Sequence, residues 1–513
     1  MLLSFIASGL IYSGLSYKAS AQVDFDSTTS ANYQNFSVKV ADQSLLENPA
    51  CQDFINYSKN EMNTFGVVVL KGGKPVLEFY NQGSDATKKY KLWSISKTFS
   101  GLMLGTLVQQ NKLSLDSRVA DFLPASEGDK DKDPNFRKDL TVRHLWTMSS
   151  GIDWCEYTPC AALDALKLMY GLPRADSLNW VWNRGLNYPP GEVYTYSSGN
   201  AVMLQSVFKK LLGNNAYQDL PLNIFTPLQI TDWAIEQDDA NLYMGGSGLS
   251  LNTRDFSKLG QLIVQKGVWK GKTLFPKSFY TEMVTPSHAI QSPLTPDAIK
   301  SWEGPVGGSI WLNQIVDGVP QFFKTAPQDM IYGGGKFGQF LLIFPDTDPA
   351  KTLVVARNGG DENHSPYWEP FTNRALKCFA PDKIQIPTDR PDPKPPETDP
   401  EQRKKAVAEI LHDRLPVNML AQEHCNCRFV GGFKTVDECK KFFPSSETGW
   451  LFPRIVVDEA NSSVSAYTTF GVAIGSKAVA AFDKSKPHLG CKVTVRAQPL
   501  TPQDFDSEIF KNY

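Results

Sequence analysis

Residues 91–107 read Lys91-Leu-Trp-Ser-Ile-Ser-Lys-Thr-Phe-Ser-Gly-Leu-Met-Leu-Gly-Thr-Leu107 and follow a strand-like run. Their spacing predicts a helix that opens at Ser94, with an apolar side and two glycines that let another element approach closely. Lys97 lies three residues after Ser94, so both side chains rise from one helical face. A hydroxyl and an amine held this close are a nucleophile and a possible base. This segment is therefore the first candidate for the chemistry of the chain.

The Ser-x-x-Lys spacing is not specific by itself, because Ser and Lys are common residues. A second copy occurs at Ser206-Val-Phe-Lys209. Its surroundings form an ordinary amphipathic helix, with Lys209 on the side predicted to face solvent. We interpret Ser206 as structural and look for support for Ser94 elsewhere in the chain.

Length and charge limit the classes of function. The chain has 513 residues and a formal net charge of −2, so two or three domains are expected. A net charge this close to zero gives no electrostatic basis for binding nucleic acid or an anionic membrane. We therefore expect no nucleic-acid partner.

The first 21 residues resemble an export signal. Residues 2–15 are mostly apolar, and Ala19-Ser-Ala21 precedes Gln22 in the manner of an A-x-A cleavage site. The segment before the apolar run lacks Lys and Arg, which departs from the usual pattern. An uncleaved anchor is the alternative, but fourteen residues are short for a membrane span. We expect a signal peptide at 1–21, a secreted or periplasmic protein, and no stable membrane insertion.

Export predicts that the eight cysteines form disulfides. We expect Cys155 to pair with Cys160 locally. Helices near the two ends of the first domain should pack side by side, which favours a Cys51–Cys378 bond. The four cysteines of the last ninety residues are then left to pair among themselves. Cys-x-Cys spacing at 425–427 is too short for a typical zinc site, and the six histidines are scattered, so no metal is expected.

Periodicity predicts a discontinuous α/β domain that carries an inserted helical domain. Strands and one helix occur at both ends, and the middle, about 160–290, is mainly helical. The expected strands are 65–70, 75–80, 308–312, 339–344 and 352–357, and the expected helices include 51–59, 140–151 and 368–378.

The composition changes at 387–400, a Pro-rich stretch typical of a stiff linker. Residues 22–386 precede it as the first domain, and 401–513 follow as a small disulfide-stapled module with one helix at about 402–414. The module carries no chemical motif, and it is a candidate for binding an unidentified partner. A chain ending near Arg390 is expected to keep its activity.

Several segments together resemble the class C β-lactamase-like family, which includes penicillin-binding peptidases, esterases and 6-aminohexanoate-oligomer hydrolases. The resemblance covers roughly residues 60–378 and not the module. It rests on Ser94-Ile-Ser-Lys97, on 140–151, on Tyr196-Ser197-Ser198, on the Gly-rich 246–256, and on Gly335-Lys-Phe-Gly-Gln339. It implies an α/β (α+β) fold in which an antiparallel sheet is flanked by helices.

The resemblance also implies a serine hydrolase of the carboxylesterase or amidase type that needs no cofactor. Ser94 would be the nucleophile, and Lys97, buried near positive or dipolar groups, would take its proton. Tyr196 would pass that proton to the leaving group, and Ser198 would hold the hydrogen-bond network together. The substrate would be a small-molecule ester or amide.

Gly335 and Lys336 are the expected binding residues of the third motif. Backbone N–H groups of Ser94 and Lys336 would form the oxyanion hole. The family's Lys-Thr-Gly or His-x-Gly corresponds here to glycines 333–335, which lack the cation that binds a substrate carboxylate. The same glycines also fit a plain turn.

Three alternative interpretations of the function are considered. A β-lactamase or D-Ala-D-Ala peptidase is the alternative enzyme, and a non-catalytic binding protein on the same fold is the alternative of another class. The joint presence of Ser94, Lys97 and Tyr196 speaks against the binding protein. An α/β-hydrolase triad is disfavoured because no G-x-S-x-G elbow occurs.

Overall fold

The computed structural model describes residues 23–33, 36–123, 137–156, 163–361, 365–387, 400–442, 453–468 and 476–499. The predicted signal peptide, Cys160 with its predicted bond to Cys155, and most of the 387–400 linker lie outside the described residues.

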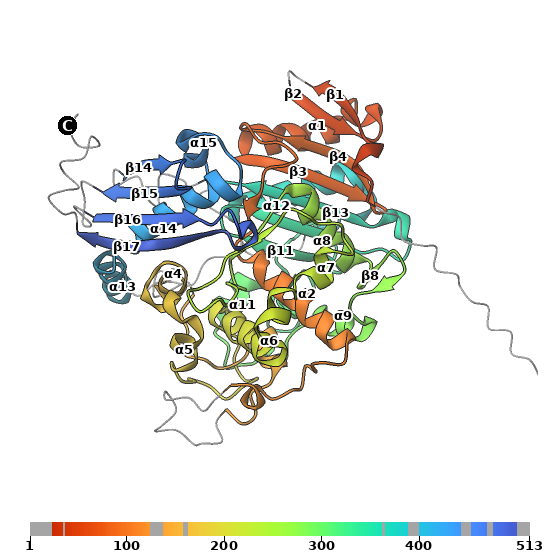
Figure 1. The fold of residues 1–513 in the computed structure, drawn as a ribbon. Coiled ribbons are helices and arrows are strands. Elements are labelled where there is room, and N and C mark those ends of the chain that lie inside the picture. Colours follow the sequence, from red (N-terminus) through yellow and green to blue (C-terminus); the bar gives the residue numbers. More distant parts are fainter. Residues whose placement is uncertain are drawn as a thin grey trace, which may run out of the picture.

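An eight-stranded antiparallel sheet forms the centre of the first domain (Figure 1). Its order is β1-β2-β4-β3-β13-β12-β11-β10. The strands are β1 Thr29–Tyr33, β2 Phe36–Val40, β3 Thr64–Lys71, β4 Lys74–Tyr80, β10 Trp311–Leu312, β11 Ile331–Gly335, β12 Gln339–Phe344 and β13 Leu353–Gly359. Because β3 pairs with β13, the two ends of the domain meet in mid-sheet. This confirms the discontinuous domain and the antiparallel sheet flanked by helices.

Helices cover both faces of the sheet, and β3 shows why. Val67 and Val69 face a core that contains α1 (Pro49–Asn56) and α12 (Ser365–Phe379). Val68 and Leu70 face the opposite core with α2 (Ile95–Gln109) and α8 (Thr253–Val264). A strand that is apolar on both faces is buried on both sides.

The predicted contact between α1 and α12 is present, and the disulfide Cys51–Cys378 joins the two helices. This confirms the pairing expected from the sequence. The bond links elements that are 327 residues apart in the chain.

The inserted segment is a lobe of mostly short helices with few strands, as the periodicity predicts. Its helices are α3 Val142–Trp146, α4 Leu163–Tyr170, α5 Ser177–Trp182, α6 Ser198–Gln218, α7 Leu222–Phe225, α9 Lys277–Met283, α10 His288–Gln291 and α11 Asp297–Glu303. Its short strands, with β5 Tyr90–Lys91 of the preceding segment, are β6 Ala234–Ile235, β7 Leu249–Leu251, β8 Val268–Trp269 and β9 Lys272–Thr273. The helix expected over 140–151 is shorter because Met148 takes a positive φ.

The C-terminal module is a four-stranded antiparallel sheet packed on a helix. It contains α13 Pro400–His412, α14 Leu415–Cys425, α15 Val436–Lys440, β14 Pro453–Asp458, β15 Ser463–Thr468, β16 Ser476–Phe482 and β17 Cys491–Pro499. The bonds Cys425–Cys491 and Cys427–Cys439 confirm that its four cysteines pair with one another. The sequence did not indicate α14, because all of its residues are buried and it shows no polar face.

Other elements also differ from the expectation. β1 and β2 lie in the opening segment, where only a helix was expected, and the strand at 308–312 is limited to Trp311–Leu312. Glycines 333–335 belong to strand β11, so the turn interpretation is wrong. Because successive positions of a strand point to opposite faces, adjacent glycines of this run contact different neighbours.

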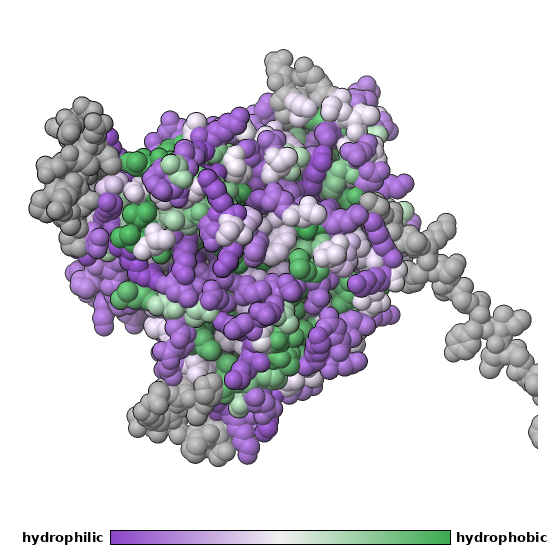
Figure 2. Space-filling model, viewed as in Figure 1, coloured by the Kyte–Doolittle hydropathy of each residue, from purple (hydrophilic) through white to green (hydrophobic). Residues whose placement is uncertain are grey.

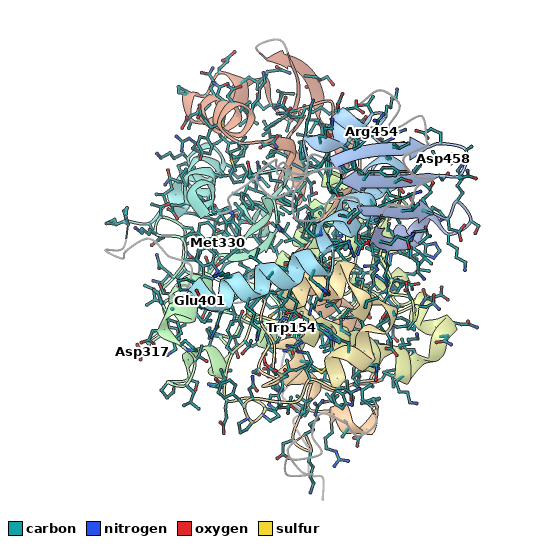
Figure 3. The ribbon with its side chains drawn as sticks, turned by 90° about the vertical axis from the view of Figure 1, so that its left-hand side faces the viewer. Trp154, Asp317, Met330, Glu401, Arg454 and Asp458 are labelled. Atoms are coloured by element: carbon teal, nitrogen blue, oxygen red, sulfur yellow. A yellow bond between two sulfur atoms is a disulfide. The ribbon has the colours of Figure 1, made fainter. Side chains whose placement is uncertain are left out.

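The face seen in Figure 2 is mainly hydrophilic, with apolar side chains in scattered groups. Figure 3 shows the module sheet, with Arg454 and Asp458, beside α13 and above the lobe that carries Trp154. Among the helices that the structure describes, none combines the length and apolar character needed to cross a bilayer.

Candidate active site

Ser94 occupies the N-cap position of α2, yet its side chain makes no capping hydrogen bond. The preceding Trp93 has a φ of 51°, in the left-handed region that a bulky residue rarely adopts. Leu92 is held by a hydrogen bond of 2.7 Å from its N–H to the Leu249 carbonyl. The chain therefore turns sharply into the helix and leaves the Ser94 hydroxyl for another partner.

That partner is Lys97, whose Nζ donates to Ser94 Oγ at 3.3 Å and to the Gly246 carbonyl at 3.0 Å. The Lys97 side chain is 3% exposed. Burial lowers its pKa, and the carboxylate of Glu156, 3.7 Å away, opposes that change. The expected burial is present. The expectation of positive or dipolar neighbours is met by the Gly246 carbonyl dipole, whereas the charged groups that act most on the pKa of Lys97 are the carboxylates Glu156 and Glu303.

Tyr196 and Ser198 lie at the start of α6 beside the same amine. Lys97 Nζ is 4.7 Å from the centre of the Tyr196 ring, which stacks on Trp311. Ser198 donates from Oγ to Glu156 Oε1 at 2.7 Å and from its backbone N–H to Oε2 at 2.9 Å. Ser198 thus reaches Lys97 through Glu156, a residue that the sequence analysis missed.

Glu156 is fixed by a third donor as well. The indole Nε1 of Trp154 donates to Glu156 Oε2 at 2.6 Å. Three hydrogen bonds and one cation hold this carboxylate in a single position. Its neighbour Cys155 is disulfide-bonded. No local motif marks an isolated glutamate in a loop, so the spacing rules could not find it.

Glu303, at the end of α11, is the second carboxylate that the sequence analysis missed. It accepts hydrogen bonds from Trp311 Nε1 at 2.8 Å and from the Tyr194 hydroxyl at 3.4 Å. Burial raises its pKa to about 7. Such a group exchanges its proton near neutral pH and lies within electrostatic range of Lys97.

These residues border a cavity of about 360 Å³. The predicted residues Ser94, Tyr196, Ser198, Gly335 and Lys336 all line it, so the structure brings them together. Aromatic side chains form much of the remaining wall, namely Trp93, Trp302, Trp311, Phe322, Tyr332 and Trp368. A cavity of this size and lining suits an apolar small molecule with a few polar groups.

The three glycines of β11 allow close packing on both faces of the strand. A side chain at Gly334 would collide with the Trp368 ring, and one at Gly335 would collide with the Leu92 carbonyl oxygen. A Cβ at Gly333 would lie 2.8 Å from Ile95 Cδ1. Gly333, the position where the related motifs carry a cation, therefore packs here against the Ile95 side chain at the start of α2.

The second Ser-x-x-Lys has different surroundings. Ser206 Oγ donates to the Val202 carbonyl one turn back at 2.9 Å, and Lys209 Nζ donates to the Ala240 carbonyl at 2.6 Å. Both are helix-packing contacts, which supports the structural interpretation. Within the described ranges, no group of three or more His, Cys, Asp or Glu side chains is placed to hold a metal ion.

Comparison with known proteins places this chain in a family. A sequence profile of the beta-lactamase family matches residues 54–369. The 6-aminohexanoate-dimer hydrolase of Paenarthrobacter ureafaciens is 22% identical over 220 residues, which are 41% of this chain. The match spans about half, 54%, of that relative.

One solved structure agrees on the fold, and a second is reported for its similarity. A candidate 6-aminohexanoate-dimer hydrolase of Bacillus anthracis superposes with a TM-score of 0.50 and 17% identity, covering 64% of this chain and 82% of that one. A D-stereospecific amidohydrolase of a Streptomyces species has a TM-score of 0.43 and 19% identity, covering 65% and 99%. Since the profile matches more than half of the chain, this protein belongs to the beta-lactamase family of serine hydrolases.

Proposed function

We propose that the chain is an exported serine hydrolase that cleaves an ester or amide through an acyl-enzyme on Ser94. The observation that carries the proposal is the 3.3 Å contact between Ser94 Oγ and the buried Lys97 Nζ at the wall of a 360 Å³ cavity. A nucleophilic hydroxyl beside an amine of lowered pKa is the pairing that acyl transfer needs.

In this proposal, Ser94 Oγ attacks the substrate carbonyl while the neutral amine of Lys97 takes its proton. The oxyanion is bound by the backbone N–H groups of Ser94 and Lys336. Tyr196 relays the proton to the leaving alkoxide or amine, which departs as the carbonyl re-forms. Water then attacks the acyl carbonyl and releases the acid, with the same groups moving the proton in the opposite sense.

Glu156 acts as a positioning residue in this scheme. It contacts Lys97 and Ser198 at once, so it fixes where the amine lies relative to Ser94. Export is supported by the A-x-A segment before Gln22 and by the disulfides, which persist in oxidising compartments. The aminohexanoate-dimer hydrolase relative favours amide substrates among those to be tried.

The proposal is tested by intact mass after incubation with an active-site fluorophosphonate. Wild type should gain one adduct, and Ser94→Ala should gain none while its circular dichroism stays native. Ser206→Ala is the matched control and should label like wild type, because Ser206 only bonds its own helix. Labelling kept in Ser94→Ala but lost in Ser206→Ala would place the nucleophile at the other motif.

A further inference from the structure

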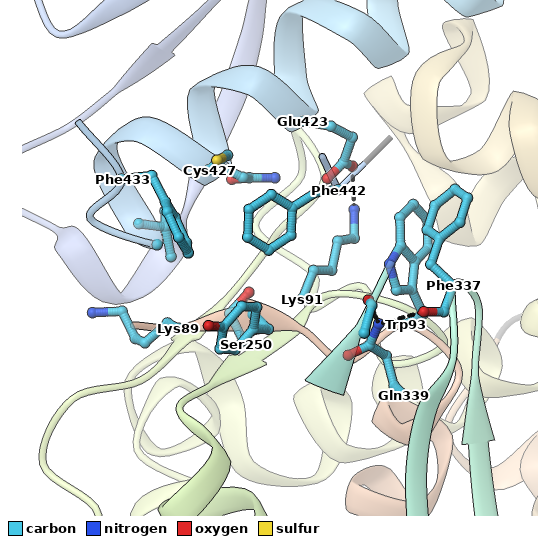
Figure 4. A pocket seen from close by; sticks show the side chains of 15 residues that line it. Lys89, Lys91, Trp93, Ser250, Phe337, Gln339, Glu423, Cys427, Phe433 and Phe442 are labelled. Atoms are coloured by element: carbon cyan, nitrogen blue, oxygen red, sulfur yellow. Dashed lines mark hydrogen bonds and ion pairs between the residues drawn. The ribbon is translucent and has the colours of Figure 1, made fainter. Parts of the chain in front are cut away.

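A buried ionic cluster joins the C-terminal module to the first domain. Lys91 of β5 contacts Glu236 at 2.7 Å and pairs with Glu423 of α14, while Arg174 lies 3.5 Å from Glu236. The four side chains are each at most 7% exposed. Figure 4 shows Lys91 extended toward Glu423, with Trp93 and Phe337 beside it.

The module completes the charge balance of this cluster. In the ion pairs of this cluster, the first domain contributes two cations, Lys91 and Arg174, and one carboxylate, Glu236. Glu423 supplies the second carboxylate, and the Tyr170 hydroxyl donates to it at 2.8 Å. Removing one member of a buried, balanced set leaves an uncompensated charge, which is far costlier than losing a surface ion pair.

The cluster reaches the nucleophile through one side chain. Lys91 Nζ lies 4.5 Å from the centre of the Trp93 ring, a cation–π contact. Trp93 directly precedes Ser94, lines the cavity and holds a positive φ. Its ring also meets Phe337 edge-on at 5.3 Å, next to Lys336. The position of Lys91 therefore affects where the backbone N–H groups of Ser94 and Lys336 lie, and these are the two predicted donors of the oxyanion hole.

We propose that Glu423 is a positioning residue for Ser94, acting through Lys91 and Trp93, so that the C-terminal module is a working part of the hydrolase site. This inference rests on the proposed function. It departs from the sequence expectation that a chain ending near Arg390 keeps its activity, because such a chain would lack Glu423. A backbone held in a rare conformation persists only where its surroundings over-determine it, and here the module provides part of those surroundings.

The test compares two carboxylate-to-amide changes in the module of the full chain. Glu423→Gln keeps an oxygen for Tyr170 but removes the charge facing Lys91. Glu409→Gln is the matched control, since Glu409 also pairs with a first-domain lysine, Lys167, but is 43% exposed. Both proteins are assayed with a nitrophenyl ester for kcat and KM separately, and with the fluorophosphonate for the labelling rate.

Glu423→Gln should lower kcat and the labelling rate together by about ten- to a hundredfold with little change in KM, because a misplaced nucleophile costs rate rather than binding. Glu409→Gln should match wild type. Equal losses in both variants, or a wild-type rate in Glu423→Gln, would overturn the inference. An unlabelled wild type would instead overturn the proposed function.

A second variant covers the case in which Glu423→Gln does not fold. Lys91→Gln combined with Glu423→Gln leaves Arg174 and Glu236 as a neutral pair, so no buried charge is uncompensated. It still removes the ammonium beside Trp93, and it should therefore show the same loss of kcat. A wild-type kcat in this double variant would refute the role assigned to Lys91 and Glu423.

Discussion

At the scale of single residues, the site depends on carboxylates that no motif predicts. Glu156 and Glu303 come from a loop and a short helix, and they lie beside Lys97 only in the folded chain. They oppose the effect of burial on the amine, which also lowers the cost of placing a lysine there. The protonation of Lys97 therefore depends on residues outside the motif. Glu303, with a pKa of about 7, should be the group that changes charge near neutral pH.

The pH dependence of stability should report Glu303. Its pKa rises to about 7 in the folded chain from its ordinary value of 4.5, so the folded state holds the proton more tightly between these pH values. Its contribution to the free energy of unfolding is complete below pH 4.5 and is lost as pH rises through 7, on the order of 3 kcal/mol. Glu303→Gln removes this titration. Relative to wild type, the variant should gain stability from pH 5 to 8 in urea unfolding.

A suitable control is Glu282→Gln, which changes an exposed carboxylate that pairs with Arg143. Its stability should run parallel to wild type over the same pH range. A constant difference between Glu303→Gln and wild type from pH 5 to 8 would show that Glu303 does not exchange its proton there.

At the scale of elements, strand β11 is positioned against the Ser94 turn by its glycines. Successive side chains of a strand point to opposite faces, so neighbouring glycines meet different parts of the molecule. Gly335 faces the Leu92 carbonyl, whereas Gly334 faces Trp368 of α12. The strand can approach the turn before α2 only because Gly335 carries no Cβ.

Alanine substitutions at Gly334 and Gly335 should distinguish an effect on packing from an effect on catalysis. Gly335→Ala pushes on the backbone two residues before Ser94, and a displacement near 1 Å can cost about a hundredfold in kcat. Gly334→Ala pushes on an indole ring instead and should cost about 1–3 kcal/mol of stability, with a smaller effect on kcat. Ester kinetics and urea unfolding of both variants give the comparison. A larger loss of kcat in Gly334→Ala would contradict this assignment of faces.

At the scale of the whole molecule, the cavity exists only where distant parts meet. Its walls come from the turn before α2 and from α4, α6, α11, β10, β11 and α12. Glu423 of the C-terminal module pairs with Lys91, which packs against Trp93 of that turn. The lining is mostly aromatic, and among the described residues that line it the cation is Lys336, beyond the glycines. A β-lactam carries a carboxylate next to its reactive carbonyl, so this lining favours an uncharged acyl group.

Substrate preference should follow that lining. Loss of a charge-assisted contact to a carboxylate forfeits about 1.5–3 kcal/mol, a tenfold to hundredfold effect. Short-chain nitrophenyl esters should therefore be cleaved with a higher kcat/KM than penicillins or cephalosporins, measured on one preparation. A higher value for nitrocefin than for any ester would reverse this preference and make Lys336 the carboxylate anchor.

The sequence by itself determined the features that are encoded in local residue patterns or in the order of motifs along the chain. The strands at 65–80 and 339–357 are apolar runs between turns, and the order of motifs identifies the family and Ser94, Lys97 and Tyr196 as a set. The Cys51–Cys378 bond followed from helices at the two ends of one discontinuous domain.

Tertiary structure alone decided what depends on contacts between distant segments. A helix buried all round, such as α14, shows no periodic polar face, and isolated glutamates such as Glu156 carry no spacing signal. The contact of Glu423 with Lys91 joins residues 332 positions apart. Side-chain periodicity reports only which face is buried, and burial against a particular partner is fixed when the whole chain packs.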